Sequence, residues 1–218
     1  KEVYMIYGHK GAGKTVLALS FPGKIVAFSF DNKTAIVWKN MYKSDPRIKV
    51  YDAMIKADYT TPERMTESAA EVFKYLDSTL DKIAENRPDW ILIDGSEIWQ
   101  QVAEFVMRYR NNLGPFAGVA NRNIWKERRM YIRQIHNKST RVARRGVIYT
   151  TYIEKDEIVM DGELRAKTDV PRWIDAIMTE TDCVIKITSV SNKGARRHMA
   201  DVESSKGTLQ TGTIMDVT

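Results

Sequence analysis

An eight-residue segment near the start of the chain combines glycines with a lysine and a threonine at a spacing that suits phosphate binding. It reads Gly8-His9-Lys10-Gly11-Ala12-Gly13-Lys14-Thr15 and fits the P-loop pattern G-x-x-x-x-G-K-[ST]. Because glycine tolerates positive φ, we expect Gly8, Gly11 and Gly13 to turn main-chain N–H groups toward a phosphate, beside a helix N-terminus. The segment therefore predicts a nucleoside triphosphate site.

Two side chains at the end of this segment carry the expected chemistry. Lys14 is expected to bridge the β- and γ-phosphates, and the hydroxyl of Thr15 to take one coordination position on Mg²⁺. The nucleotide is expected to contact every residue from Gly8 to Val16. A triphosphate and Mg²⁺ are thus the predicted cofactors.

The flanks of the segment distinguish this interpretation from a chance match in an arbitrary loop. Val3–Tyr7 is a short apolar run that indicates a strand, and Thr15–Ser20 indicates a helix ended by Pro22-Gly23. A strand before and a helix after are the context that a phosphate-binding loop requires.

A second apolar run, Trp90-Ile91-Leu92-Ile93, ends in the acid Asp94 and predicts a central parallel strand. Asp94 is expected to hold the metal opposite the glycine segment. The alternative is that Asp94 only caps the helix that follows Gly95 and Ser96.

Hydrolysis also requires a group that orients water, and two acids compete for that role. Asp31 follows the second predicted strand, and Glu97 lies three residues after Asp94. Each acid also has an alternative role. Asp31 could hold only a water that does not itself attack the phosphate, and Glu97 could be an ordinary acid in the first turn of a helix. Thr150-Thr151-Tyr152 is a candidate sensor of the γ-phosphate, although threonine is common in any strand.

Strand and helix patterns alternate along the chain, with antiparallel additions at the end. This predicts one α/β domain over residues 1–218, with a mostly parallel central sheet flanked by helices and C-terminal antiparallel hairpin strands. Hairpin turns are predicted at Asp161-Gly162 and Ser191–Gly194, and a short helix over Trp173–Met178. The remaining predicted strands are residues 24–30, 48–51 and 146–151, and the remaining helices are residues 61–84, 96–109 and 124–141.

Composition limits the class of protein. The 218 residues are 43% hydrophobic and 28% charged, and no apolar run reaches the roughly 20 residues that span a bilayer. We therefore expect no membrane contact. Cys183 is the single cysteine, which fits a reducing compartment such as the cytoplasm, or the host cytoplasm for a viral protein.

The net charge of +6 permits nucleic-acid binding, and its distribution is more informative. Residues 122–145 hold nine Lys and Arg against one acid, Glu127, with Trp125, Tyr131 and His136 between them. We predict contacts to DNA phosphates and bases there. The alternative is a solvated helix whose aromatic residues face the core. The residues expected to bind DNA are Arg122, Lys126, Arg129 and Arg133.

The sequence resembles the RecA-like P-loop ATPases, in particular small phage and archaeal members related to RadB and to phage annealing-type recombinases. The resemblance rests on Gly8–Thr15 with its continuation to Lys24, on Trp90–Ser96, on Trp125 in its helix, and on Val147–Lys155. It implies ATP and Mg²⁺ bound between subunits, a ring or filament of copies, and action on single-stranded DNA in recombination or replication.

The resemblance also implies roles for individual residues. Lys14 and Thr15 match the phosphate and metal pair, Asp94 the metal acid, and Asp31 the acid, often Glu, after the second strand. Tyr152 stands where relatives often carry His, a departure from the family pattern. The residues 111–121 and 154–168 occupy the positions of DNA-binding loops. Arg196, Arg197 and, first among them, Lys206 are candidates for a basic residue that reaches the neighbouring subunit's γ-phosphate.

Three other functions share parts of this pattern. The first is a P-loop kinase of a small molecule, which needs an arginine-rich lid. The second is a viral genome-packaging motor, which needs two adjacent acids where this chain has Asp94 followed by Gly95. The third is a nucleotide-binding switch, which needs no hydrolysis.

Overall fold

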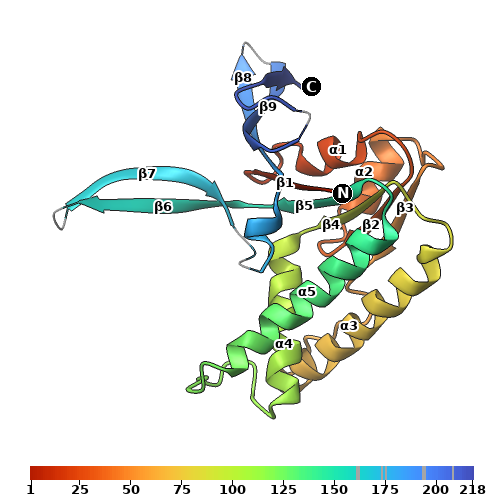
Figure 1. Ribbon diagram of the computed structural model, residues 1–218, viewed down its shortest axis with the longest axis vertical. Coiled ribbons are helices and arrows are strands. Elements are labelled where there is room, and N and C mark those ends of the chain that lie inside the picture. The colour runs from red at the N-terminus through yellow and green to blue at the C-terminus, as the bar shows by residue number, and fades with distance from the viewer. Residues whose placement is uncertain (161–162, 173, 175, 193–194, 208) are drawn as a thin grey trace.

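The fold is an eight-stranded sheet covered by helices on both faces, with a separate two-stranded hairpin (Figure 1). The computed structural model describes residues 1–160, 163–172, 174, 176–192, 195–207 and 209–218. The strand order is β10-β9-β8-β1-β5-β4-β2-β3. These strands are β1 (Glu2–Gly8), β2 (Ile25–Ser29), β3 (Ile48–Asp52), β4 (Trp90–Asp94), β5 (Gly146–Thr151), β8 (Cys183–Asn192), β9 (Ala195–Ser205) and β10 (Ile214–Asp216).

The strands from β8 to β3 pair in parallel, whereas β9 and β10 add antiparallel strands at one edge. Parallel strands buried on both faces need continuous apolar runs, and the central strands have them. A mostly parallel sheet with antiparallel C-terminal strands is thereby confirmed.

Alternation along the strands divides the core into two layers. Tyr7 and Met5 pack with the helices α3 (Pro62–Ala84), α4 (Ser96–Arg110) and α5 (Ile124–Val142). Tyr4 and Ile6 face the opposite layer with α1 (Lys14–Leu19) and α2 (Thr34–Met41). Successive side chains of a strand point to opposite faces, so one strand serves both layers.

The hairpin of β6 (Ile153–Met160) and β7 (Glu163–Pro171) continues from β5 and extends away from the helical layers (Figure 1). The prediction of paired strands is confirmed here, and the strands are longer than the sequence pattern indicated. The interpretation of residues 154–168 as a loop is wrong, because most of them form the ladder. The turn at Asp161-Gly162 lies outside the described residues.

The remaining predictions near the C-terminus have mixed outcomes. β8 and β9 form the second predicted hairpin, although Lys193 and Gly194 of its turn lie outside the described residues. The predicted helix over residues 173–178 is wrong: Ile174, Ala176 and Ile177 are not helical, and a single 3₁₀ turn, η1, spans Met178–Glu180. Of that prediction, Trp173 and Asp175 lie outside the described residues.

Candidate functional site

The loop Gly8–Thr15, called the glycine loop below, joins β1 to α1 at the carboxyl edge of the parallel strands. Gly11 and Gly13 have φ of 75° and 100°, conformations in which a side chain would be strained. Gly8 does not have positive φ, contrary to expectation. It is needed for close packing, because a Cβ there would lie 2.4 Å from the carbonyl oxygen of Ile187.

Asp94 ends β4 beside this loop and is 3% exposed. Its carboxylate accepts hydrogen bonds from the hydroxyls of Thr15, at 3.0 and 3.2 Å, of Thr34, at 2.6 Å, and of Thr150. Burial raises the pKa of the Asp94 carboxyl, and these hydroxyl donors oppose the rise. Gly95, not Asp94, is the N-cap of α4, so Asp94 does not serve as a helix cap.

Lys14 lies beside Asp94 at the start of α1. Its ammonium donates to the carbonyl oxygens of Gly8 at 2.9 Å and His9 at 3.0 Å, and lies 4.3 Å from the centroid of the Tyr152 ring. Burial lowers the pKa of Lys14, while the carboxylates of Glu97, Asp94 and Asp31 act in the opposite direction. The ammonium is thus held within the loop by two main-chain carbonyl oxygens.

The two competing acids have different surroundings. Asp31 accepts from the main-chain N–H of Lys33 at 3.1 Å and lies 3.7 Å from its ammonium. Glu97 projects from the first turn of α4, and its Oε2 is buried without a hydrogen-bond partner. Burial raises the pKa of the Glu97 carboxyl, and Lys14 opposes the rise. Glu97 is therefore the acid with a carboxylate oxygen that has no partner among the described residues.

A pocket of about 300 Å³ joins these groups into one site. It is lined by the glycine loop, by Val16, and by the ends of β4 and β5 with Asp31, Val37 and Met41. Polar groups that suit a charged ligand and apolar side chains of α2 thus line the same pocket. Thr34, the first residue of α2, was not among the predicted site residues.

The candidate sensor residues lie in the same pocket, but two of their hydroxyls are already engaged. Thr150 donates to Asp94, and Thr151 donates to the carbonyl oxygen of Arg172 at 3.0 Å. Tyr152 supplies the ring beneath Lys14.

Two further side chains reach the glycine loop from β9. His198 Nδ1 lies 2.7 Å from the carbonyl oxygen of Ala12, and Arg196 lies against Gly11. Lys206 lies at the amino ends of the parallel strands, away from the glycine loop. Its main-chain N–H donates there to the carbonyl oxygen of Asp182, near the start of β1. Arg197 lies 3.9 Å from Asp216. The sequence pattern drew attention to Arg196 but gave no signal for His198.

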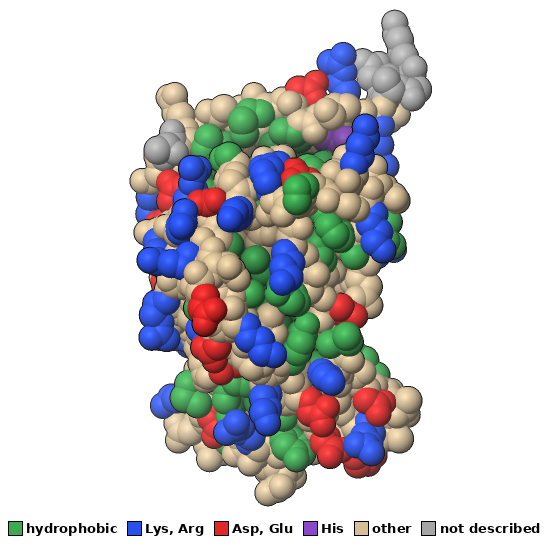
Figure 2. All heavy atoms as spheres, turned by 90° about the vertical axis from the view of Figure 1, so that its right-hand side faces the viewer, with side chains coloured by type: hydrophobic (Ala, Val, Ile, Leu, Met, Phe, Trp, Pro, Cys, Tyr) green, Lys and Arg blue, Asp and Glu red, His purple; other side chains and the backbone are tan. Residues whose placement is uncertain are grey.

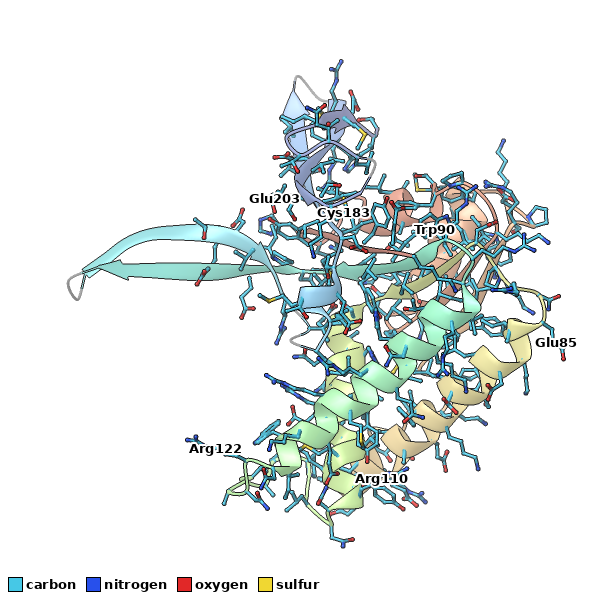
Figure 3. All side chains as sticks on the ribbon, viewed as in Figure 1. Glu85, Trp90, Arg110, Arg122, Cys183 and Glu203 are labelled. Carbon is cyan, nitrogen blue, oxygen red and sulfur yellow. The ribbon has the colours of Figure 1, made fainter. Side chains whose placement is uncertain are left out.

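The predicted DNA-binding residues lie on or next to α5. Lys126, Arg129 and Arg133 are exposed on the helix, whereas Arg122 precedes it in a turn. The spacing of Arg122, Arg129 and Arg133 predicts one shared helical face, and this prediction is wrong for Arg122. Figure 3 shows Arg122 at the end of the helical layer that is farthest from the sheet. Basic side chains are also spread over the side of the molecule turned away from the hairpin, so α5 is not their sole location (Figure 2).

The aromatic residues of α5 are less available than the base-stacking hypothesis requires. Tyr131 and His136 are buried, and His136 contacts the hydroxyl of Tyr149 at 2.8 Å and Glu180 at 3.1 Å. Trp125 packs partly against the core, with the guanidinium of Arg128 5.1 Å from its ring. The expectation that Tyr131 and His136 stack on bases is therefore wrong.

No family model and no curated protein matches this chain. Within the described residues, no group of three or more His, Cys, Asp or Glu side chains gathers as a metal cluster. No described helix has the length and apolar character needed to cross a bilayer.

Proposed function

We propose that this chain is a RecA-like P-loop ATPase that binds ATP with Mg²⁺ at the glycine loop. The observation that carries the proposal is the hydrogen bond from Thr15 to the buried Asp94, beside Lys14 and across from Glu97. A hydroxyl, a carboxylate and an ammonium meet there at a loop whose glycines leave its backbone accessible.

The donor chemistry of this site fits Mg²⁺. This ion prefers oxygen ligands, keeps several waters, and is usually held by one or two protein oxygens together with phosphates. Thr15 and Asp94 would hold it, and Mg²⁺ would supply charge neutralisation for the phosphates.

Glu97 is the residue that we propose to orient the attacking water. Its Oε2 has no hydrogen-bond partner among the described residues, and burial raises the pKa of its carboxyl, a direction that favours proton acceptance, whereas Asp31 is engaged by Lys33. Lys14 would leave the carbonyl oxygens of Gly8 and His9 and donate to the phosphates.

We extend the proposal to single-stranded DNA as the partner, on the basic surface of α5, and to a ring or filament of copies in the cytoplasm. The exposed Lys126, Arg129 and Arg133 support phosphate contacts more than base contacts. Recombination or replication is the corresponding process.

One observation favours a second candidate, a nucleotide-dependent switch that hydrolyses slowly or not at all. The Tyr152 ring lies 4.3 Å from the Lys14 ammonium, at the strand end where a γ-phosphate sensor is expected. An aromatic ring offers the phosphate no charge, so it suits binding more than rapid turnover.

Steady-state ATP turnover of Lys14→Ala and Lys24→Ala variants tests the proposal. Removing the ammonium that stabilises the transition-state charge should lower turnover by about 100-fold or more. Lys24 lies at the opposite end of β2 and is exposed, so Lys24→Ala should leave turnover unchanged. Equal turnover of wild type and Lys14→Ala would refute the assignment of the site.

A further inference from the structure

The hairpin of β8 and β9 lies directly beside the glycine loop. β8 pairs in parallel with β1, with Ile187 opposite Gly8, so Thr188 and Ser189 continue past the point where β1 ends. On β9, His198 pairs with Ser189 and Arg196 with Ser191. These residues thus extend the sheet alongside the loop (Figure 1).

Ser189 organises the two side chains of β9 that face the loop. Its hydroxyl accepts from Arg196 Nε at 2.7 Å and lies 3.1 Å from His198 Nδ1. Because the carbonyl oxygen of Ala12 can only accept, the Nδ1 at 2.7 Å from it must carry the proton. The hydrogen bond from His198 to Ala12 therefore links β9 to the glycine loop.

The guanidinium of Arg196 lies beside Gly11, and within the described ranges of the chain its terminal nitrogens donate no hydrogen bond. A Cβ at Gly11 would lie 3.7 Å from Arg196 Nη2. Arg196 is exposed and forms no ion pair with an acid in the part of the chain that the structure describes, whereas the adjacent Arg197 lies 3.9 Å from Asp216. Successive strand residues face opposite ways, which explains the difference.

The surroundings of Arg196 favour an anion. It lines a second hollow, of about 350 Å³, together with His9 and Lys10 of the glycine loop. Lys10 also lines the nucleotide pocket, so the two hollows meet at the glycine loop. The acid that lines this hollow, Asp169, is already bonded to Lys155 and lies 3.1 Å from Lys186. Hydrogen bonds from these two lysines lower the pKa of Asp169, so it remains charged and neutralised by them. Lys10 and Arg196 form no ion pair with any acid that the structure describes.

We propose that Arg196 is a second phosphate-binding cation of the nucleotide site, supplied by the same chain that supplies Lys14. It binds the terminal phosphate of ATP where the phosphate passes Gly11, through the planar pair of N–H donors that suits phosphate oxygens. The inference rests on the proposed function. It differs from the expectation for this family, in which the basic residue comes from a neighbouring subunit and for which Lys206 was the first candidate.

Equilibrium binding of Mg²⁺-ATP and Mg²⁺-ADP to Arg196→Ala and Arg197→Ala variants tests this role. Loss of a charge-assisted contact to the terminal phosphate should weaken ATP binding by about 10- to 100-fold. ADP lacks that phosphate, so its affinity should change less than about threefold. Arg197→Ala is the matched control and should bind both nucleotides as the wild type does.

Equal weakening for ATP and ADP in Arg196→Ala would overturn the proposal, and so would unchanged binding of both. A wild-type chain that binds neither nucleotide would instead refute the proposed function itself. Mixing Arg196→Ala with Lys14→Ala chains tests the assignment to one chain. Binding should stay weak in the mixture, whereas recovery would show that Arg196 acts on a neighbouring copy.

Discussion

At the scale of single residues, the buried carboxylate of Asp94 is the feature with the clearest energetic consequence. Its oxygens accept hydrogen bonds from three hydroxyl groups, and among the described residues it forms no ion pair. A buried carboxylate with only neutral donors costs stability, and that cost is retained where a cation must be recruited. We therefore expect Asp94 to destabilise the ligand-free protein and to fit the Mg²⁺ site proposed above.

The Asp94→Asn variant should be more stable than the wild type in the absence of ligand. Because burial raises the folded-state pKa of Asp94 above its ordinary 3.8, ionisation above that pH favours the unfolded chain. The stability difference should be largest at neutral pH and vanish as the pH falls toward 3.8. Thermal unfolding between about pH 4 and about pH 8 measures it.

Asp156→Asn, an exposed acid of β6, is the control and should shift the unfolding temperature little. The account requires that Asp94→Asn also lose Mg²⁺-dependent ATP binding. An Asp94→Asn protein that unfolds below the wild type at neutral pH would contradict it.

At the scale of elements, α5 separates into a core face and a charged face. Ile132 and Ile135 are buried against the other helices, and Arg129 and Arg133 are exposed on the other side. Positive charge on an exposed helix attracts nucleic-acid phosphates whatever the base sequence.

The double variant Arg129→Ala with Arg133→Ala should bind single-stranded DNA more weakly. It should also reduce the slope of log affinity against log salt by about 1.4, the value for two phosphate contacts. Fluorescence anisotropy over a salt series measures both. Lys74→Ala with Lys82→Ala removes two exposed charges from α3 and is the matched control. An unaltered slope in the α5 variant would exclude this face.

Elements with strong local signals were predictable from sequence. α3 begins where Thr61 accepts from the N–H of Arg64 at 3.3 Å, with Pro62 in its first turn. The region around Met178 was not predictable, because its few apolar residues fit a helix and an irregular segment equally. Burial of Tyr131 and His136 was also missed, since aromatic residues between bases suit either a core or a binding surface.

At the scale of the whole molecule, the site draws on both ends of the chain. Gly8 to Thr15, Asp94 and Glu97 were identifiable because a motif or a strand end marks each of them. Thr34 and His198 reach the same place through tertiary pairing of distant strands, which no local pattern encodes. Lys206 is the opposite case, a residue that was predicted to act at a nucleotide but lies away from this one. Its position in the sequence did not reveal that β9 ends at the amino ends of the parallel strands, far from the glycine loop.

This convergence makes nucleotide binding the property on which the whole account depends. Titration calorimetry of the intact chain with ATP, in the presence and absence of Mg²⁺, measures it most directly. The account predicts saturable binding that Mg²⁺ strengthens and that Lys14→Ala abolishes. A wild-type chain that gives no saturable heat with ATP and Mg²⁺ would contradict it.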